Sequence, residues 1–151
     1  IAVRPWLDDA DPKVAVVAAR ALGKLRDTES ALLLRAKMEE AGLDVRIRQA
    51  ILYALTDLEG KGATALVVAQ GQNPLLTVDA CQILAILKDP EALPFLRNIV
   101  ATHYNGYTRG EATKAIKAIE GARKGATPPG GTATATAPKE RPKLTFPKKA
   151  P

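Results

Sequence analysis

The residues that could do chemistry in this chain of 151 amino acids are few. Cys81 is the only thiol and His103 the only imidazole, so a Cys–His nucleophilic pair is the one covalent catalyst they could form. Zinc sites built from several Cys or His ligands are excluded, and so is an internal disulfide. In the helical repeat described below, Cys81 falls on an inner helix among packing residues and His103 at a corner between helices. We therefore interpret Cys81 as a small, partly buried packing residue and His103 as a solvated loop residue.

A cluster of carboxylates near the start of the chain is the next candidate. Asp8, Asp9 and Asp11 could together hold a cation. The alternative, which we favour, is that Asp11 caps a helix and its two neighbours are solvated. No glycine-rich segment has the spacing of a phosphate-binding loop before a helix and a lysine. We expect no catalytic residue, no metal and no cofactor, and therefore no enzyme.

A repeat organises most of the chain. Residues 11–25, DPKVAVVAARALGKL, recur at offsets of 33, 62 and 94, an average period of about 31 residues. Periods of roughly 20–50 residues are typical of stacked repeats. Asp11, Asp44 and Asn105 open three of the copies, and such side chains can accept hydrogen bonds from the free amides of a first helical turn. The equivalent apolar positions of the four copies are Leu22, Leu55, Leu84 and Ile116.

Each repeat is predicted to contain two helices. The inner helices are expected over residues 11–25, 44–58, 75–87 and 107–121, and the outer helices over 29–41, 63–72 and 90–102. Apolar residues at i, i+3, i+4 and i+7 define the buried face of the first inner helix. The members of that face are Val14, Val17, Ala18, Ala21, Leu22 and Leu25. Residues 1–8 fit the end of an outer helix, and we expect a preceding repeat of a longer array to cover their apolar side chains.

The segment LDDADPKVAVVAARALGKLRDTESA resembles the short bacterial HEAT-like repeat, of the type also found in phycobiliprotein lyases. The segments LDVRIRQAILYALTDLEG and ILAILKDPEALPFL fit the same pattern more loosely. The resemblance spans residues 1–121 and implies an all-α solenoid of about four helical hairpins, the first of them incomplete. In such a solenoid the hairpins stack into a right-handed superhelix with the inner helices along its concave face. The family implies a scaffold or binding module more often than a bilin lyase or a nucleic-acid-binding protein.

The concave face is the predicted binding surface. Positions opposite the core of each inner helix form two columns when the repeats are stacked. One column contains Lys13, Arg46, Leu75 and Tyr107, and the other contains Arg20, Tyr53, Gln82 and Lys114. Basic, aromatic and amide groups without a carboxylate would suit an acidic or extended peptide. The alternative is an ordinary solvated helix face.

The charge of the chain is divided unevenly. The net charge is +6, yet residues 1–121 contain 15 basic and 15 acidic residues, so the excess lies in residues 122–151. Residues 122–140 are rich in Pro, Gly, Thr and Ala and are predicted to be a flexible or extended linker. Residues 141–151 are predicted to be a docking motif. Its apolar anchors and basic guides are Arg141, Lys143, Leu144, Phe146, Lys148 and Lys149.

Two other interpretations of this tail stay open. It could be a disordered terminus without a role, or a basic arm for nucleic acid, where counterion release rewards each neutralised phosphate. The tail contains only one aromatic residue, and the repeat array has no net charge. Nucleic acid is therefore the second candidate partner, after protein.

The sequence as a whole predicts a non-catalytic scaffold for protein–protein interaction. We expect the C-terminal part of a larger HEAT-repeat protein, whose basic, Pro-rich tail docks on a partner within a larger assembly. A bilin-lyase-like enzyme subunit and a nucleic-acid-binding solenoid are the alternatives. No run of 18 apolar residues is present, so no membrane span is expected. The sequence does not fix the compartment, with the cytoplasm slightly favoured.

Overall fold

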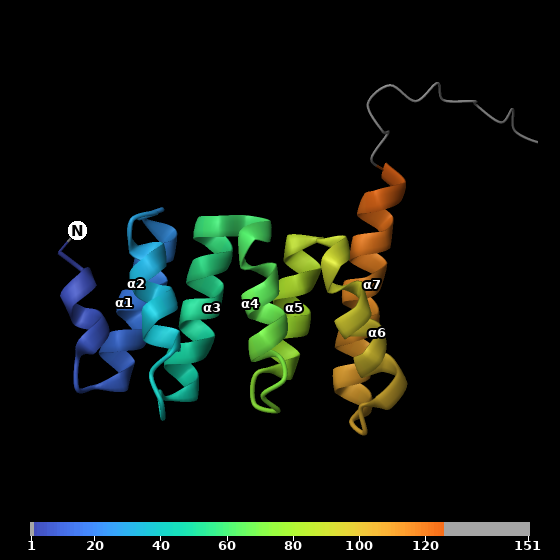
Figure 1. The fold of residues 1–151 in the computed structure, drawn as a ribbon, viewed down its shortest axis with the longest axis horizontal. Helices are drawn as coiled ribbons and strands as arrows, with labels where there is room; N and C mark the ends of the chain where they lie inside the picture. The colour runs from blue at the N-terminus through green and yellow to red at the C-terminus, as the bar shows by residue number, and fades with distance from the viewer. Residues whose placement is uncertain (1, 126–151) are drawn as a thin grey trace, which may run out of the picture.

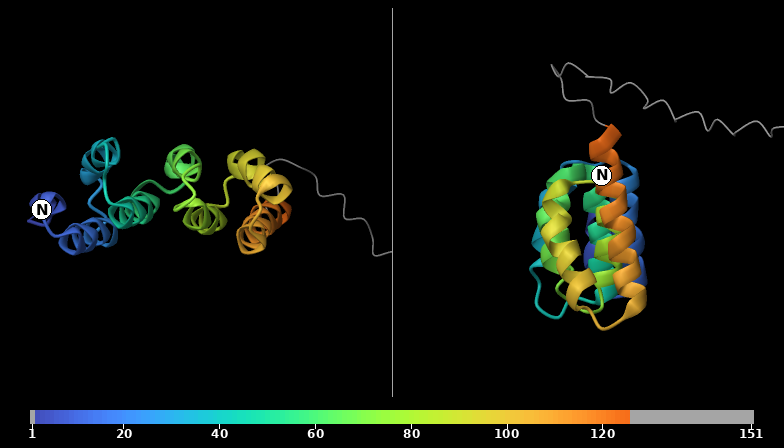
Figure 2. Two further views of the ribbon diagram at one scale, coloured as in Figure 1. Left: turned by 90° about the horizontal axis from the view of Figure 1, so that it is seen from below. Right: turned by 90° about the vertical axis from the view of Figure 1, so that its right-hand side faces the viewer.

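The computed structural model describes residues 2–125. The predicted linker over 126–140 and the tail motif over 141–151 therefore lie outside the described residues. Within 2–125 the chain is helical and contains no strand, which confirms the all-α prediction. The helices stand side by side in two rows, seen from the front in Figure 1 and from below in the left panel of Figure 2.

The two rows contain alternate elements of the chain. The inner row consists of α1 (Pro12–Lys24), α3 (Val45–Glu59), α5 (Thr77–Leu87) and α7 (Gly106–Gly125). The outer row consists of η1 (Arg4–Asp8), α2 (Ser30–Met38), α4 (Thr64–Gln70) and α6 (Leu93–Thr102), with η2 (Gly60–Ala63) and η3 (Pro90–Ala92) leading into α4 and α6. These elements follow the predicted order and lie close to the predicted ranges.

The last helix is longer than the sequence analysis predicted. Residues 122–125 belong to α7 and not to the linker. The physical reason is local, because Ala122, Arg123 and Lys124 are good helix formers. The two cations also interact favourably with the negative end of the helix dipole in the last turn.

The ends of the inner helices repeat the same chemistry. Side-chain oxygens of Asp11, Asp44 and Asn105 accept hydrogen bonds from the amides of Lys13, Arg46 and Tyr107 at 2.9, 2.8 and 2.8 Å, which confirms the predicted caps. At the other end, α1, α3 and α5 are each followed at once or after one residue by a residue with positive φ. These residues are Arg26, Gly60 and Lys88, with φ of 55°, 55° and 52°. Lys88 also has the ψ of the left-handed helical conformation that commonly ends helices (40°), whereas ψ of Gly60 is −128°.

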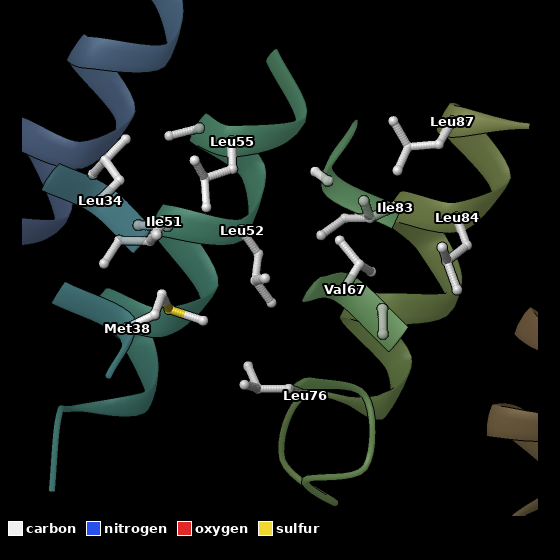
Figure 3. Close-up of a cluster of buried hydrophobic side chains, with 14 of the residues drawn as sticks. Leu34, Met38, Ile51, Leu52, Leu55, Val67, Leu76, Ile83, Leu84 and Leu87 are labelled. Carbon is white, nitrogen blue, oxygen red and sulfur yellow. The ribbon is translucent and has the colours of Figure 1, made fainter. Parts of the chain in front are cut away.

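The core lies between the two rows. Leu22, Leu55 and Leu84 are fully buried at equivalent positions, as predicted, and Ile116 of α7 is half-buried. Figure 3 shows the middle of this core, built by side chains from α2, α3, α4 and α5. The side chains labelled there are Leu34, Met38, Ile51, Leu52, Leu55, Val67, Leu76, Ile83, Leu84 and Leu87.

The predicted buried face of the first inner helix is wrong at two positions. Val17 is 66% exposed and Leu25 is 57% exposed. The face of α1 that packs best contains Ala15, Ala19 and Gly23, which are buried against the next inner helix. The prediction assumed that an inner helix packs on each side of α1, whereas in residues 2–125 no inner helix precedes α1.

Side-chain volume sets the spacing within the inner row. A β-carbon on Gly23 would lie 2.8 Å from Cα of Ala54, so α1 and α3 approach closely through small residues. The equivalent positions between α3 and α5 hold Thr56 and Ile83, which are bulkier, and these two helices pack more loosely. Figure 3 shows Leu52, Val67 and Ile83 pointing into the space between them. The wider gap is therefore filled by large apolar side chains.

Ion pairs of one type tie the outer row to the inner row. Arg4 of η1, Arg35 of α2 and Arg97 of α6 each bind one carboxylate. Their partners are Asp27 in the loop after α1, Glu59 at the end of α3 and Glu120 in the last two turns of α7. The Arg4–Asp27 pair is the best built of the three. Nε and Nη2 of Arg4 donate to Oδ2 and Oδ1 of Asp27 at 2.8 and 2.6 Å, and the Ser30 hydroxyl donates to the same carboxylate.

The Arg4–Asp27 pair predicts how stability responds to acid. Hydrogen bonds from Arg4 and Ser30 lower the pKa of Asp27 from 3.8 to about 2. An unfolded chain therefore binds a proton at this residue before the folded chain does, so folding is favoured above about pH 4 and the benefit is lost as the pH falls toward 2. In urea unfolding, Asp27→Asn should lower the midpoint at pH 6. The midpoints of parent and variant should converge as the pH approaches 2, whereas a constant offset across this range would contradict the assignment.

Candidate binding face

The two groups best suited to covalent chemistry are both in ordinary structural environments. Cys81 is fully buried in α5, and burial raises the pKa of its thiol to about 11, which keeps it protonated and weakly nucleophilic. His103 follows α6 directly, where its Nδ1 accepts a hydrogen bond from the amide of Asn105 at 3.1 Å. Its ring stacks on Tyr104 at a centroid distance of 4.9 Å. The packing role predicted for Cys81 is confirmed.

The acidic residues near the start of α1 are engaged by protein groups. Asp11 caps α1, Asp9 accepts a hydrogen bond from the amide of Asp11 at 2.8 Å, and Asp8 pairs with Lys37 at 2.7 Å. Within residues 2–125, no group of three or more His, Cys, Asp or Glu side chains could hold a metal ion. The capping interpretation of Asp11 is therefore confirmed.

A polar groove of about 490 Å³ crosses the inner row between α1, α3 and α5. We call the surface around it the polar face. The groove is lined by Arg20, Lys24, Gln49, Tyr53, Ala54, Asp57, Asp79 and Gln82. Residues three or four apart lie on the same side of a helix, so each of α1, α3 and α5 turns one side with several of these residues toward the groove.

Hydrogen bonds connect the polar face from helix to helix. The Tyr53 hydroxyl donates to Gln82 Oε1 at 3.5 Å, and Gln82 Nε2 donates to Glu111 Oε2 at 3.4 Å. Lys114 Nζ then donates to Glu111 Oε1 at 2.7 Å. The structure thus joins three members of the predicted second column, namely Tyr53, Gln82 and Lys114, and Arg20 lines the same groove as Tyr53 and Gln82.

The charge of the polar face differs from the prediction. The sequence columns contain no carboxylate, yet Asp57 and Asp79 line the groove and Glu111 bonds to Lys114. The prediction was wrong because each column follows only one position per repeat. Residues at other positions on the same helices also contribute to the surface. Asp79 accepts a hydrogen bond from Gln49 at 2.7 Å, so this carboxylate belongs to the face and is held in place.

The environment of each titrating group on this face follows from its neighbours. A hydrogen bond from Lys114 lowers the pKa of Glu111, and the same contact raises the pKa of Lys114. Burial raises the pKa of Tyr53, with Asp79 raising it further and Arg20 opposing the shift. The Tyr53 phenol therefore feels one carboxylate and one guanidinium. Arg20 and Lys24 form no ion pair within residues 2–125, so two cations of the groove are available.

The predicted first column is less suited to binding. Arg46 is held by Asp44, with Nε to Oδ1 at 3.0 Å and Nη2 to Oδ2 at 2.8 Å, and this contact lowers the pKa of Asp44 to about 2. Leu75 and Tyr107 are exposed, by 71% and 63%, near the starts of α5 and α7. Lys13 lines a different groove, described next. The structure therefore does not bring the first column together around one hollow.

A second groove, of about 440 Å³, lies between η1 and α1 and was not predicted as a hollow. We call it the N-terminal groove. It is lined by Val3, Trp6, Lys13, Val14, Val17, Ala18 and Ala21. The apolar residues of 1–8 and the valines of α1 were the features of the sequence that could have indicated this groove.

No known protein family, curated protein or solved structure matches the chain. Among residues 2–125, no helix combines the length and apolar character needed to cross a membrane.

Proposed function

We propose that residues 2–125 are part of an α-solenoid of HEAT-like hairpins that acts as a non-catalytic scaffold for protein partners. The observation that carries this proposal is the repetition of contacts along the chain. Asx caps at the starts of α1, α3 and α7, positive-φ residues after α1, α3 and α5, and Arg–carboxylate pairs from η1, α2 and α6 recur along the described residues. Repeat arrays of this type present long surfaces suited to extended partners.

The polar face is the proposed binding surface. Arg20 and Lys24 offer unpaired cations, Tyr53 offers a half-buried ring with a polar tip, and Gln49 and Gln82 offer amides. Asp57 and Asp79 add acceptors for donors on a partner. This mixture favours an extended peptide with both acidic and polar side chains over a nucleic acid. Acidic side chains of a peptide can face Arg20 and Lys24 while its donors face Asp57 and Asp79, whereas a continuous phosphate backbone would bring negative charge against these carboxylates.

The remaining parts of the proposal concern residues outside 2–125. The tail motif, with Leu144 and Phe146 as anchors, is proposed to dock on a partner and to raise the effective concentration of the array near it. The array itself is proposed to belong to a larger HEAT-repeat protein.

A peptide library tests the polar face. Random peptides displayed on phage and selected against the full chain should yield extended binders that combine acidic side chains with hydrogen-bond donors. The affinity of these binders is then measured by fluorescence polarisation. The double substitution Arg20→Glu and Lys24→Glu should weaken binding by about tenfold or more, because two attractive contacts become repulsive.

The matched control is Lys61→Glu with Lys88→Glu. It makes the same change in net charge at exposed positions near helix ends and outside the groove. The control should leave the affinity within about twofold of the parent, since surface substitutions away from a contact have small effects. Equal losses of affinity in both variants would mean that only the overall charge of the chain matters. That result would contradict binding at the polar face.

A further inference from the structure

Each inner helix packs on the next one through two different sides. In the α1–α3 contact, α1 contributes small residues, and a β-carbon on Gly23 would lie 2.8 Å from Cα of Ala54. We call the side of a helix that faces the preceding inner helix its receiving side. On α3 the receiving side contains Ile47, Ala50 and Ala54, which are 6%, 0% and 1% exposed.

The later inner helices are covered at the same positions. At α5 these are Leu76, which directly precedes the helix, and Ile83, both buried. The third is Asp79, which is half-buried and accepts a hydrogen bond from Gln49 of α3. On α7 they are Thr108, Glu111 and Ala115, all buried. The receiving side of every later inner helix is therefore buried or half-buried in the described residues, and at α5 a side chain of α4, Val67, adds to the cover (Figure 3).

The first inner helix is the exception. Its equivalent residues are Val14, Val17 and Ala21, and they form one wall of the N-terminal groove. Val17 is 66% exposed, and Trp6 on the opposite wall is 57% exposed. Figure 2 (left) shows α1 as the first helix of the α1–α3–α5–α7 row, with η1 beside it, and residues of these two elements line the groove. The established helix–helix interface thus continues into an apolar surface with nothing on it in residues 2–125.

The opposite end of the row is built differently. The positions on α7 equivalent to Ala15, Ala19 and Gly23 of α1 are Arg109, Thr113 and Lys117, and the two charged ones are exposed. Long cationic side chains cannot reproduce the close approach that Gly23 permits. The α7 end of a second copy is therefore a poor occupant of the N-terminal groove. The groove requires a helix with small residues at these positions.

We propose that the N-terminal groove receives an inner helix of a further HEAT-like hairpin, placed one repeat ahead of α1, with Gly or Ala where α1 has Ala15, Ala19 and Gly23. This inference rests on the repeat architecture of the proposed function and deepens it by naming the partner chemistry of one surface. Val17 and Trp6 then become core residues, as Ala50 is in α3.

Duplication of one hairpin tests this in the chain itself. Because residue 44 is equivalent to residue 11, a variant with residues 11–43 repeated in place of residues 1–10 joins the copies through the natural turn. The new copy of α1 should seat on the receiving side of the original. The midpoint of urea unfolding should then rise by about 1 M or more, since more apolar surface is buried.

The control is Val17→Arg in the second copy of the duplicated chain and in the parent. The residues equivalent to Val17 in α5 and α7 are Asp79 and Glu111, and Glu111 accepts a hydrogen bond from Gln82, the equivalent of Arg20. An arginine at residue 17 of the duplicated chain would therefore face Arg20 of the added helix and should abolish the gain by like-charge repulsion. In the parent the same substitution should leave the midpoint nearly unchanged, since residue 17 is exposed. No gain from the duplication, or a gain that survives Val17→Arg, overturns the proposal.

The unaltered chain gives a second readout, because Trp6 is its only tryptophan. A synthetic peptide of residues 11–43 lacks tryptophan. Its addition should shift Trp6 emission to shorter wavelength in a saturable way that Val17→Arg removes. Two results would instead assign the groove to another occupant. Emission that changes with protein concentration alone would indicate a second copy, and emission that shifts when residues 126–151 are deleted would indicate the tail.

The two proposals fail separately. If duplication gives no gain while library peptides still bind in an Arg20-dependent way, only the assignment of the N-terminal groove is wrong. If peptide binding is also absent, the scaffold function itself is contradicted.

Discussion

Replacement of Leu55 by alanine should lower the free energy of unfolding by about 2–5 kcal/mol, the range for large cavities in a well-packed core. Leu55 is fully buried in the middle of α3, with side chains from both rows around it (Figure 3). Neighbours on both sides leave little freedom for the site to collapse around the missing atoms. Chemical denaturation of the full chain, followed by circular dichroism, measures the change.

Leu25→Ala is the matched control for Leu55→Ala. Both remove the same atoms from a leucine of an inner-helix repeat, but Leu25 is 57% exposed. Its loss should cost less than about 1 kcal/mol, because few contacts disappear with it. If the two substitutions lowered the free energy of unfolding equally, Leu25 would also be a core residue, as the apolar pattern of α1 predicts and the structure contradicts.

Gly23→Leu should be the most disruptive change in α1. A β-carbon there would lie 2.8 Å from Cα of Ala54, which is backbone and cannot rotate away. The helices α1 and α3 would have to separate, at a cost of about 1–3 kcal/mol or more for overpacking. The substitution should also lower the midpoint of thermal unfolding measured by circular dichroism.

Gly110→Leu provides the opposite expectation for the same change of residue type. Gly110 lies within α7, and a β-carbon there would meet nothing within 4 Å. Leucine has the higher helix propensity, so this variant should gain up to about 1 kcal/mol. A loss at Gly110, or tolerance at Gly23, would contradict the packing described for the inner row.

The local features of this fold follow from the sequence. The amphipathic period and the capping residues Asp11, Asp44 and Asn105 located the inner helices to within a few residues. These signals act over one or two helical turns, which is why they can be recognised without the rest of the chain. The buried positions shared by Leu22, Leu55 and Leu84 followed in the same way, from a repeat period that superimposes equivalent turns.

The candidate site was only partly predictable. Tyr53, Gln82 and Lys114 were placed in one column, and the structure joins them through Glu111. Glu111 itself was missed, because a column follows one position per repeat and Glu111 lies three residues before the column position Lys114 on the same helix. The proposal that this face binds a peptide depends on residues from three helices acting together.

Only the tertiary structure decided which apolar residues are covered. Val17 and Ala50 hold equivalent positions with the same helical signal, yet Val17 is 66% exposed and Ala50 is fully buried. Period and composition fix which face of a helix is apolar. Cover is a property of the neighbouring element, and in residues 2–125 an inner helix lies ahead of Ala50 and none ahead of Val17. The sequence by itself determined the helices and their faces, and the arrangement of the row determined the two grooves, because burial requires a partner in space that local patterning does not specify.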